Sequence, residues 1–141
     1  MTKKMMDWFI SKLQDTSLKL AQVESYEGQF EDLDNDTTIF TPAAFVLIEH
    51  PENVGDLILS MNYNVSVYLI TTHIHGASYD SMLDLIDTLI SYLHSAPVRF
   101  DLDKEHTPPT QYFGRCFFLS ADYVAIFPGK CAYKLNFIVK A

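Results

Sequence analysis

The chain has 141 residues, of which 48% are apolar and 20% are charged, and its formal net charge is −8. A chain of this size and composition is expected to fold around one hydrophobic core without disulfide or metal cross-links. Extensive disorder and a disulfide-stabilised fold are therefore excluded. Its acidic balance and scattered basic residues argue against nucleic acid as a partner, because a phosphate backbone would be repelled.

The first half of the chain predicts one helix and two strands. Residues 2–15 have helical apolar spacing, residues 18–26 indicate a short strand, and residues 27–36 indicate an acidic, solvated loop. Residues 38–49 are almost continuously apolar, as expected for a strand buried on both faces. The apolar face of the first helix comprises Met6, Phe9, Ile10 and Leu13.

The second half begins with the clearest strand, residues 57–72, in which side chains alternate between two faces. Residues 78–93 form a helix with a broad apolar stripe, and residues 101–111 indicate an exposed loop after a short strand. Residues 112–127 and 130–140 then predict a hairpin. One face of the strand at residues 57–72 carries Met61, Tyr63, Val65, Val67 and Leu69. One face of the last strand carries Cys131, Tyr133, Leu135, Phe137 and Val139.

This order of elements predicts a single α+β domain over residues 1–141. We expect an antiparallel or mixed β-sheet with two α-helices packed on one face. No apolar run reaches the length of a membrane span, and no segment has the core of a signal peptide, so a soluble protein that is not exported is expected. Cys116 and Cys131 are expected to be free thiols, because the hairpin places them at different distances from its turn.

Four histidines offer a first candidate metal site. His73 and His75, at i and i+2, could face the same way and share a metal with His50 or His106. This spacing often arises by chance, and no cysteine or fixed acidic residue accompanies it. Solvated histidines before the second helix are therefore expected, with no metal.

A second candidate is the acidic run Asp32, Asp34 and Asp36, which resembles the start of a calcium loop. Thr37 stands where that loop needs its glycine, and Ala43 stands where it needs a bidentate glutamate. A solvated acidic loop is expected instead. Glycine-rich phosphate loops and a nucleophile elbow are also missing from the sequence, so no catalytic residue and no cofactor are predicted, and the chain is not expected to be an enzyme.

The predicted sheet has more apolar surface than two helices on one face can cover. Such excess usually marks a protein contact, so a homo-oligomer is expected. Two alternatives stay open: a long loop folds across the second face, or a bulge shifts the face assignments by one residue. The predicted subunit interface comprises Tyr68, Ile70, Phe118, Val124, Ile126 and Ile138.

Several segments together resemble a known protein family. These are the N-terminal helix, residues 23–28 (VESYEG), residues 41–48 (TPAAFVLI), the strand at residues 61–71 and the helix at residues 78–93. In this order they resemble bacteriophage tail-completion proteins, and they are most similar to the Mu-type tail protein family, whose plan is like that of tail terminators. The resemblance covers most of the chain through short motifs.

The resemblance implies a structural subunit that forms a ring, commonly a hexamer, on the last layer of the tail tube and offers a surface to head-connector proteins. It implies a place in the virion after assembly in the host cytoplasm, with no cofactor and no membrane. The acidic segments 27–36 and 101–111 would then be projecting contacts of the ring. Two other classes remain open: an adaptor subunit of another macromolecular assembly, and a small-ligand-binding or enzymatic domain with a deep polar pocket.

Overall fold

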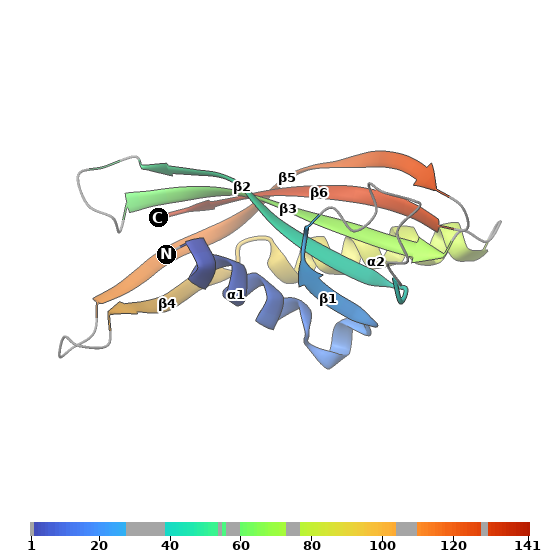
Figure 1. Cartoon of the computed structure of the whole chain (residues 1–141), viewed down its shortest axis with the longest axis horizontal. Coiled ribbons are helices and arrows are strands. Elements are labelled where there is room, and N and C mark those ends of the chain that lie inside the picture. The colour runs from blue at the N-terminus through green and yellow to red at the C-terminus, as the bar shows by residue number, and fades with distance from the viewer. Residues whose placement is uncertain are drawn as a thin grey trace.

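A curled six-stranded sheet dominates the fold (Figure 1). The computed structural model describes residues 2–27, 39–53, 55, 60–72, 77–103, 110–127 and 130–141. The elements are helix α1 (Thr2–Leu13), the 3-10 turn η1 (Thr16–Leu18), strands β1 (Gln22–Ser25), β2 (Ala43–Asn53) and β3 (Met61–Thr72), helix α2 (Ala77–Leu93), and strands β4 (Pro97–Asp103), β5 (Thr110–Phe127) and β6 (Lys130–Lys140). Neighbouring strands follow the order β1-β2-β3-β6-β5-β4, and only the β1–β2 pair is parallel.

The predicted fold class, α+β with two helices packed on one face of an antiparallel or mixed sheet, is wrong. The structure is mostly β, with about 55% of the described residues in strands, and its sheet curls into a half-barrel. The two helices fill the hollow of this curl instead of forming a layer on a flat face (Figure 1). Strands β2, β4 and β5 extend beyond their predicted bounds, whereas β1 is shorter than predicted, because sheet pairing, and not local sequence pattern alone, decides where strands begin and end.

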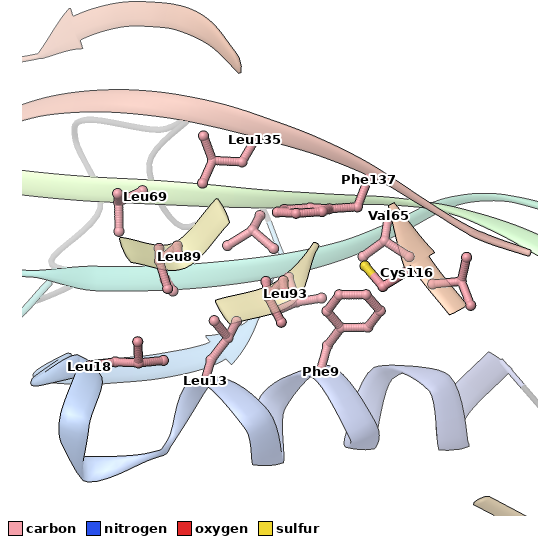
Figure 2. Packing of buried hydrophobic residues seen from close by; sticks show 14 of the residues in the cluster. Phe9, Leu13, Leu18, Val65, Leu69, Leu89, Leu93, Cys116, Leu135 and Phe137 are labelled. Carbon is pink, nitrogen blue, oxygen red and sulfur yellow. The ribbon is translucent and has the colours of Figure 1, made fainter. Parts of the chain in front are cut away.

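The main core lies between the helices and the concave side of the sheet (Figure 2). Helix α1 buries Met5, Phe9 and Leu13, which repeat every four residues along one face. The predicted stripe of α2 is confirmed, because Met82, Ile86, Leu89 and Leu93 are all buried. Burying a large apolar side chain contributes roughly 1.5–3 kcal/mol, so this packing holds both helices against the sheet.

The predicted faces of the two clearest strands are also confirmed. In β3 and β6 the odd-numbered residues from Tyr63 to Leu69 and from Cys131 to Val139 contribute to the main core. We call this side of the sheet the core face and the opposite side the outer face. Strand β2 is buried on both faces at its start, as predicted, because Ala43, Ala44, Phe45 and Val46 have no exposed surface.

Strand β2 continues through Pro51 to Asn53, beyond the predicted end of this strand at residue 49. Strand β1 pairs with β2 only as far as Val46, so the later part of β2 pairs on one side, with β3. A proline lacks the N–H that a second neighbour would need, but an edge strand has no such neighbour there. The sheet therefore tolerates Pro51, which pairs with Tyr63.

The predicted loop at residues 101–111 is shorter than expected. Strand β4 extends to Asp103 and β5 begins at Thr110, while residues 104–109 lie outside the described part. The polar residues at its two ends pair across the strands: Gln111 accepts from Arg99 at 3.0 Å and donates to Asp101 at 2.7 Å. Cross-strand bonds thus satisfy side chains that the sequence analysis assigned to solvent.

Candidate functional site

The six residues of the predicted interface do not lie together. Ile70 is fully buried, and Phe118 packs on the core face against Phe137, with ring centroids 5.7 Å apart. Tyr68, Val124 and Ile138 are half-buried on the outer face, whereas the side chain of Ile126 lies outside the described part. The assignment of Ile70 and Phe118 to an exposed outer patch is therefore wrong.

A bulge in β5 explains the error for Phe118. Its register with β6 jumps from Phe118↔Phe137 to Ser120↔Asn136, which leaves Leu119 as the extra residue. An extra residue exchanges the faces of everything that follows it in a strand. Phe118 and Val124 therefore point to opposite faces, although both have even numbers.

A second apolar cluster explains the burial of Ile70. Ala43, Phe45, Ile70 and Ala132 are buried on the outer face, and Tyr26, Ile39, Tyr68 and Val124 pack around them. Tyr26 stacks on Tyr68 with ring centroids 4.7 Å apart. Residues from the chain before β2 thus cover this part of the outer face, which agrees with the first of the two alternatives left open by the sequence.

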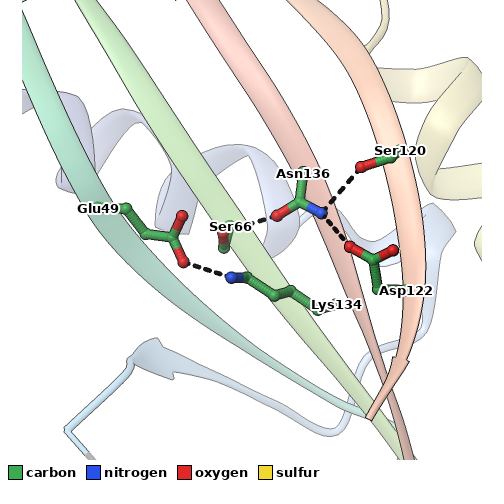
Figure 3. A network of polar contacts seen from close by, with 6 residues as sticks. All are labelled: Glu49, Ser66, Ser120, Asp122, Lys134 and Asn136. Atoms are coloured by element: carbon green, nitrogen blue, oxygen red, sulfur yellow. Dashed lines mark hydrogen bonds and ion pairs between the residues drawn. The ribbon is translucent and has the colours of Figure 1, made fainter.

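The middle of the outer face is polar (Figure 3). Asn136 accepts from the buried hydroxyl of Ser66 at 3.1 Å and donates to Ser120 at 3.0 Å and to Asp122 at 2.8 Å. These bonds tie β3, β6 and β5 together across the sheet. Because its polar groups bind one another, this region is not an apolar contact surface.

An ion pair adjoins that network. The Lys134 ammonium pairs with the Glu49 carboxylate (Figure 3), at a distance of 2.6 Å. It also lies 5.8 Å from the Tyr68 ring centroid. Its bond to Glu49 raises the pKa of Lys134 above the ordinary value. Both side chains are partly exposed, so the pair contributes little to stability, but it holds the charge of Lys134 in place on the outer face.

Strand β5 has a free edge beyond its bulge. The amides of Cys116 and Phe118 point away from β6, since they donate to Ala96 O and His94 Nδ1, each at 3.0 Å. In an antiparallel pair, alternate residues direct their N–H and C=O groups away from the partner strand. Counting along β6 from Phe137, the partner of Phe118, shows that the N–H and C=O groups of Ala121 and Tyr123 also point away from β6. Within the described ranges, no strand pairs with β5 there.

Large apolar side chains accompany this edge. Leu119 is 57% exposed and Tyr123 is 52% exposed, so each presents more than half of its surface to solvent. An open edge with exposed apolar residues is a ready site for pairing with another chain, and proteins usually protect such edges with charges or proline. Asp122 is the one charged residue of β5 after the bulge. We call residues 119–124 the β5 edge.

A groove lies at the other end of β5, on the outer face. It has a volume of about 450 Å³, and Phe113 beside it is 55% exposed. The Arg99 guanidinium lies 4.5 Å from the Phe113 ring centroid, and Arg115 pairs with Lys140 across the β5–β6 ladder. The residues that line the groove are Pro97, Phe113, Gly114, Arg115, Phe117, Lys140 and Ala141.

The sequence analysis missed both surfaces. It counted Arg99, Arg115 and Lys140 as scattered, yet strand pairing brings them to one end of the sheet. No linear signal marks this grouping, because it depends on the register of three strands. Leu119 was placed correctly in a strand, but its exposure follows from the missing neighbour of β5.

A further pocket, of about 480 Å³, lies near the start of α2. Of the described residues that line it, only Lys19 is ionisable; the others are Leu18, Thr41, Pro42, Thr71, Thr72, Ser81, Met82 and Leu85. An acid–base pair needs two ionisable groups within reach of one substrate. The described lining therefore does not supply such a pair.

The candidate metal ligands fall largely outside the described residues. This applies to His73, His75 and His106, to the side chain of His50, and to the Asp32–Asp34–Asp36 run. Among the described residues, no group of three or more histidine, cysteine or acidic side chains is placed to hold a metal ion.

Both cysteines are buried and free, as predicted. Burial raises the pKa of Cys116 to about 12, so its thiol stays protonated near neutral pH. A protonated, buried thiol is a poor nucleophile. Cys116 is therefore a core residue, and its side chain packs in the main core.

Comparisons with known proteins give no match: neither a protein-family model nor a curated protein sequence is similar to this chain. In the part of the chain that the structure describes, no helix has both the length and the apolar character needed to cross a membrane.

Proposed function

We propose that this chain is a structural subunit of a bacteriophage tail, which assembles with copies of itself into a ring that caps the tail tube and helps to join tail to head. The observation that carries the proposal is the β5 edge, where the side of β5 that faces away from β6 has no partner strand among the described residues and Leu119 and Tyr123 are exposed. The order of elements that resembles tail terminators supports the same assignment.

The β5 edge supports a contact through strand pairing. A second strand would supply partners for the backbone groups of Ala121 and Tyr123 and would cover the two apolar side chains. Burying apolar surface contributes about 25 cal/mol per Å², and the two exposed side chains are among the largest on the described surface. An edge of this kind fits a subunit that works inside an assembly.

The first experiment measures the mass of the purified wild-type chain by size-exclusion chromatography with light scattering. A ring gives one defined multiple of the 16.1-kDa subunit, and the resemblance implies a multiple of six. A monomer at every concentration tested contradicts the proposal.

The second experiment asks whether the assembly acts on tail tubes. Electron microscopy of purified tubes should show the protein at tube ends, and adding it during polymerisation should stop tube growth. An adaptor subunit of another assembly would form oligomers without binding tube ends, so this result separates the two classes.

A pair of variants links the result to the β5 edge. Leu119→Lys with Tyr123→Lys adds two charges to the edge, which should prevent strand pairing and abolish binding at tube ends or assembly. The matched control is Gln14→Lys with Ser91→Lys, which adds the same charge at exposed positions elsewhere. Equal behaviour of the two double variants would remove the β5 edge as support for the proposal.

A further inference from the structure

The groove at the end of the outer face is basic in an acidic protein. Arg115 and Lys140 line it, and Arg99 lies over Phe113 at its side; these are three of the ten basic residues in a chain of net charge −8. Among the described residues, no carboxylate lies within ion-pair distance of these three cations. Arg115 donates to the Ser95 carbonyl at 2.7 Å, and Arg99 donates to Gln111, whose amide donates in turn to Asp101.

Aromatic side chains give the same groove an apolar floor. Phe113 and Phe117 line it, and Phe113 presents 55% of its surface to solvent. A cation above an aromatic ring combines charge with apolar contact area, as Arg99 does over Phe113. A fitting occupant therefore carries carboxylates beside an apolar side chain.

The solvent-facing side of α2 has this composition. Leu83 is 38% exposed, and Asp84 and Asp87 are exposed beside it. Residues three and four apart are neighbours on a helix surface, so Leu83 and Asp87 lie together with Asp84 next to them. No lysine or arginine occurs anywhere in α2, so its own helix offers these acids no partner.

We propose that the groove of one copy binds the exposed face of α2 of the next copy. Leu83 would enter the groove against Phe113 and Phe117, while Asp84 and Asp87 would meet Arg115 and Lys140. The charges are complementary in sign and the apolar parts correspond. This inference rests on the proposed ring and names the contact that closes it.

The positions of the two surfaces fit a ring. The groove is on the outer face, whereas α2 lies in the hollow of the curled sheet, so one copy cannot bring its own two surfaces together (Figure 1). The contact is heterologous, with a different surface from each partner. Repeated heterologous contacts produce closed rings or open filaments, whereas an isologous contact stops at a dimer.

Electrostatics also selects this pairing over others. Two copies of net charge −8 repel each other at random orientations, and the groove is the described surface where basic residues gather. Complementary local charge then decides which surfaces meet. Raising the salt concentration should weaken the assembly, because partly exposed charge pairs are screened.

The test reverses the charge on each surface separately. The groove variant carries Arg115→Glu and Lys140→Glu, and the helix variant carries Asp84→Lys and Asp87→Lys; all four side chains are exposed, so the fold should persist. Each variant alone should lose assembly, with at least a tenfold rise in the concentration at which half of the chains are assembled. Thermal unfolding checks that each variant remains folded.

Mixing the two variants gives the decisive measurement. The acidic groove of one variant then faces the basic helix of the other, and the two unchanged surfaces also match. The mixture should therefore assemble in strict alternation, with the two chains in equal amounts. A control variant, Lys12→Glu with Lys19→Glu, makes the same change of net charge as the groove variant at exposed sites elsewhere and should assemble like the wild type.

The outcomes separate this inference from the proposed function. A wild-type chain that never assembles overturns both. A wild-type ring with groove and helix variants that assemble normally, or with a mixture that stays unassembled, overturns the groove–α2 contact and leaves the ring standing.

Discussion

The polar network of Figure 3 yields a quantitative prediction about Asn136. Ser66 is 1% exposed, and its hydroxyl donates to Asn136 Oδ1 at 3.1 Å. Asn136→Ala removes that acceptor and leaves a buried hydroxyl without a partner. Leaving a buried polar group unsatisfied costs about 1–3 kcal/mol, so we expect the free energy of unfolding to fall by about 2 kcal/mol.

A double-mutant cycle isolates this effect from the other bonds of Asn136. Ser66→Ala removes the hydroxyl itself and leaves only the half-buried amide, which water can reach, so it should cost less than about 1 kcal/mol. In the Ser66→Ala background, Asn136→Ala should cost about 0.5–1 kcal/mol. The coupling free energy between the two residues is then about 1–1.5 kcal/mol.

The assay is urea unfolding of all four chains at one protein concentration, followed by the fluorescence of Trp8. Trp8 is the single tryptophan and packs against Phe9 with ring centroids 5.0 Å apart, so it reports on docking of α1. Thermal midpoints should move by about 4–8 °C for a loss of 2 kcal/mol in a chain of this size.

A control and a refuting result complete the cycle. Ser120→Ala removes an exposed partner of Asn136 and should change stability by no more than about 0.5 kcal/mol. If the costs of Ser66→Ala and Asn136→Ala simply add, within about 0.3 kcal/mol, the buried hydroxyl does not depend on Asn136 and the reasoning fails.

Three other predictions concern single residues. Burial raises the pKa of the Cys116 thiol to about 12, so this thiol should not react with a disulfide reagent at pH 8 until urea unfolds the chain. The raised pKa also stabilises the folded state. This stabilisation should be fully present below about pH 9 and should be lost as pH rises toward 12. Rapid reaction of the native protein would contradict this. The backbone bond from Ser17 lowers the pKa of Asp15, so Asp15→Asn should reduce stability at pH 7, and the difference between the two chains should shrink as pH falls below 3.8 and Asp15 becomes protonated; a difference that stays constant in acid would show another cause. Gly114→Ala should lower the free energy of unfolding by about 1–3 kcal/mol, because the added Cβ would lie only 2.9 Å from the Lys140 carbonyl oxygen. An unchanged urea midpoint would show that β5 and β6 can move apart at this position without cost.

Side-chain periodicity was a reliable guide inside single elements. Helical spacing identified Phe9 and Leu13 as buried residues of α1, and alternation identified the core-facing residues of β3 and β6. These predictions succeeded because a residue's face depends on local backbone geometry, which repeats every 3.6 residues in a helix and every two in a strand. The two free cysteines followed from similarly local reasoning.

Predictions that depended on strand pairing were less successful. The faces of Phe118 and Val124 were confused by one extra residue at Leu119, which leaves no mark in an apolar run. The fold class was wrong because the sheet curls into a half-barrel around the two helices, and strand ends were misplaced because Pro51 and Asp103 both lie in strands, against their local preferences. Edge position and cross-strand bonds override such preferences, and neither is visible before the partner strand is known.

The amino-acid sequence alone thus established the core faces of β3 and β6, the two helices and the acidic net charge. Tertiary structure alone decided the curl of the sheet, the free edge at Tyr123, and the meeting of Arg115 with Lys140 at one groove. The physical reason is one of range. Periodicity acts between near neighbours in the chain, whereas register, curl and surface grouping depend on contacts between residues far apart in it.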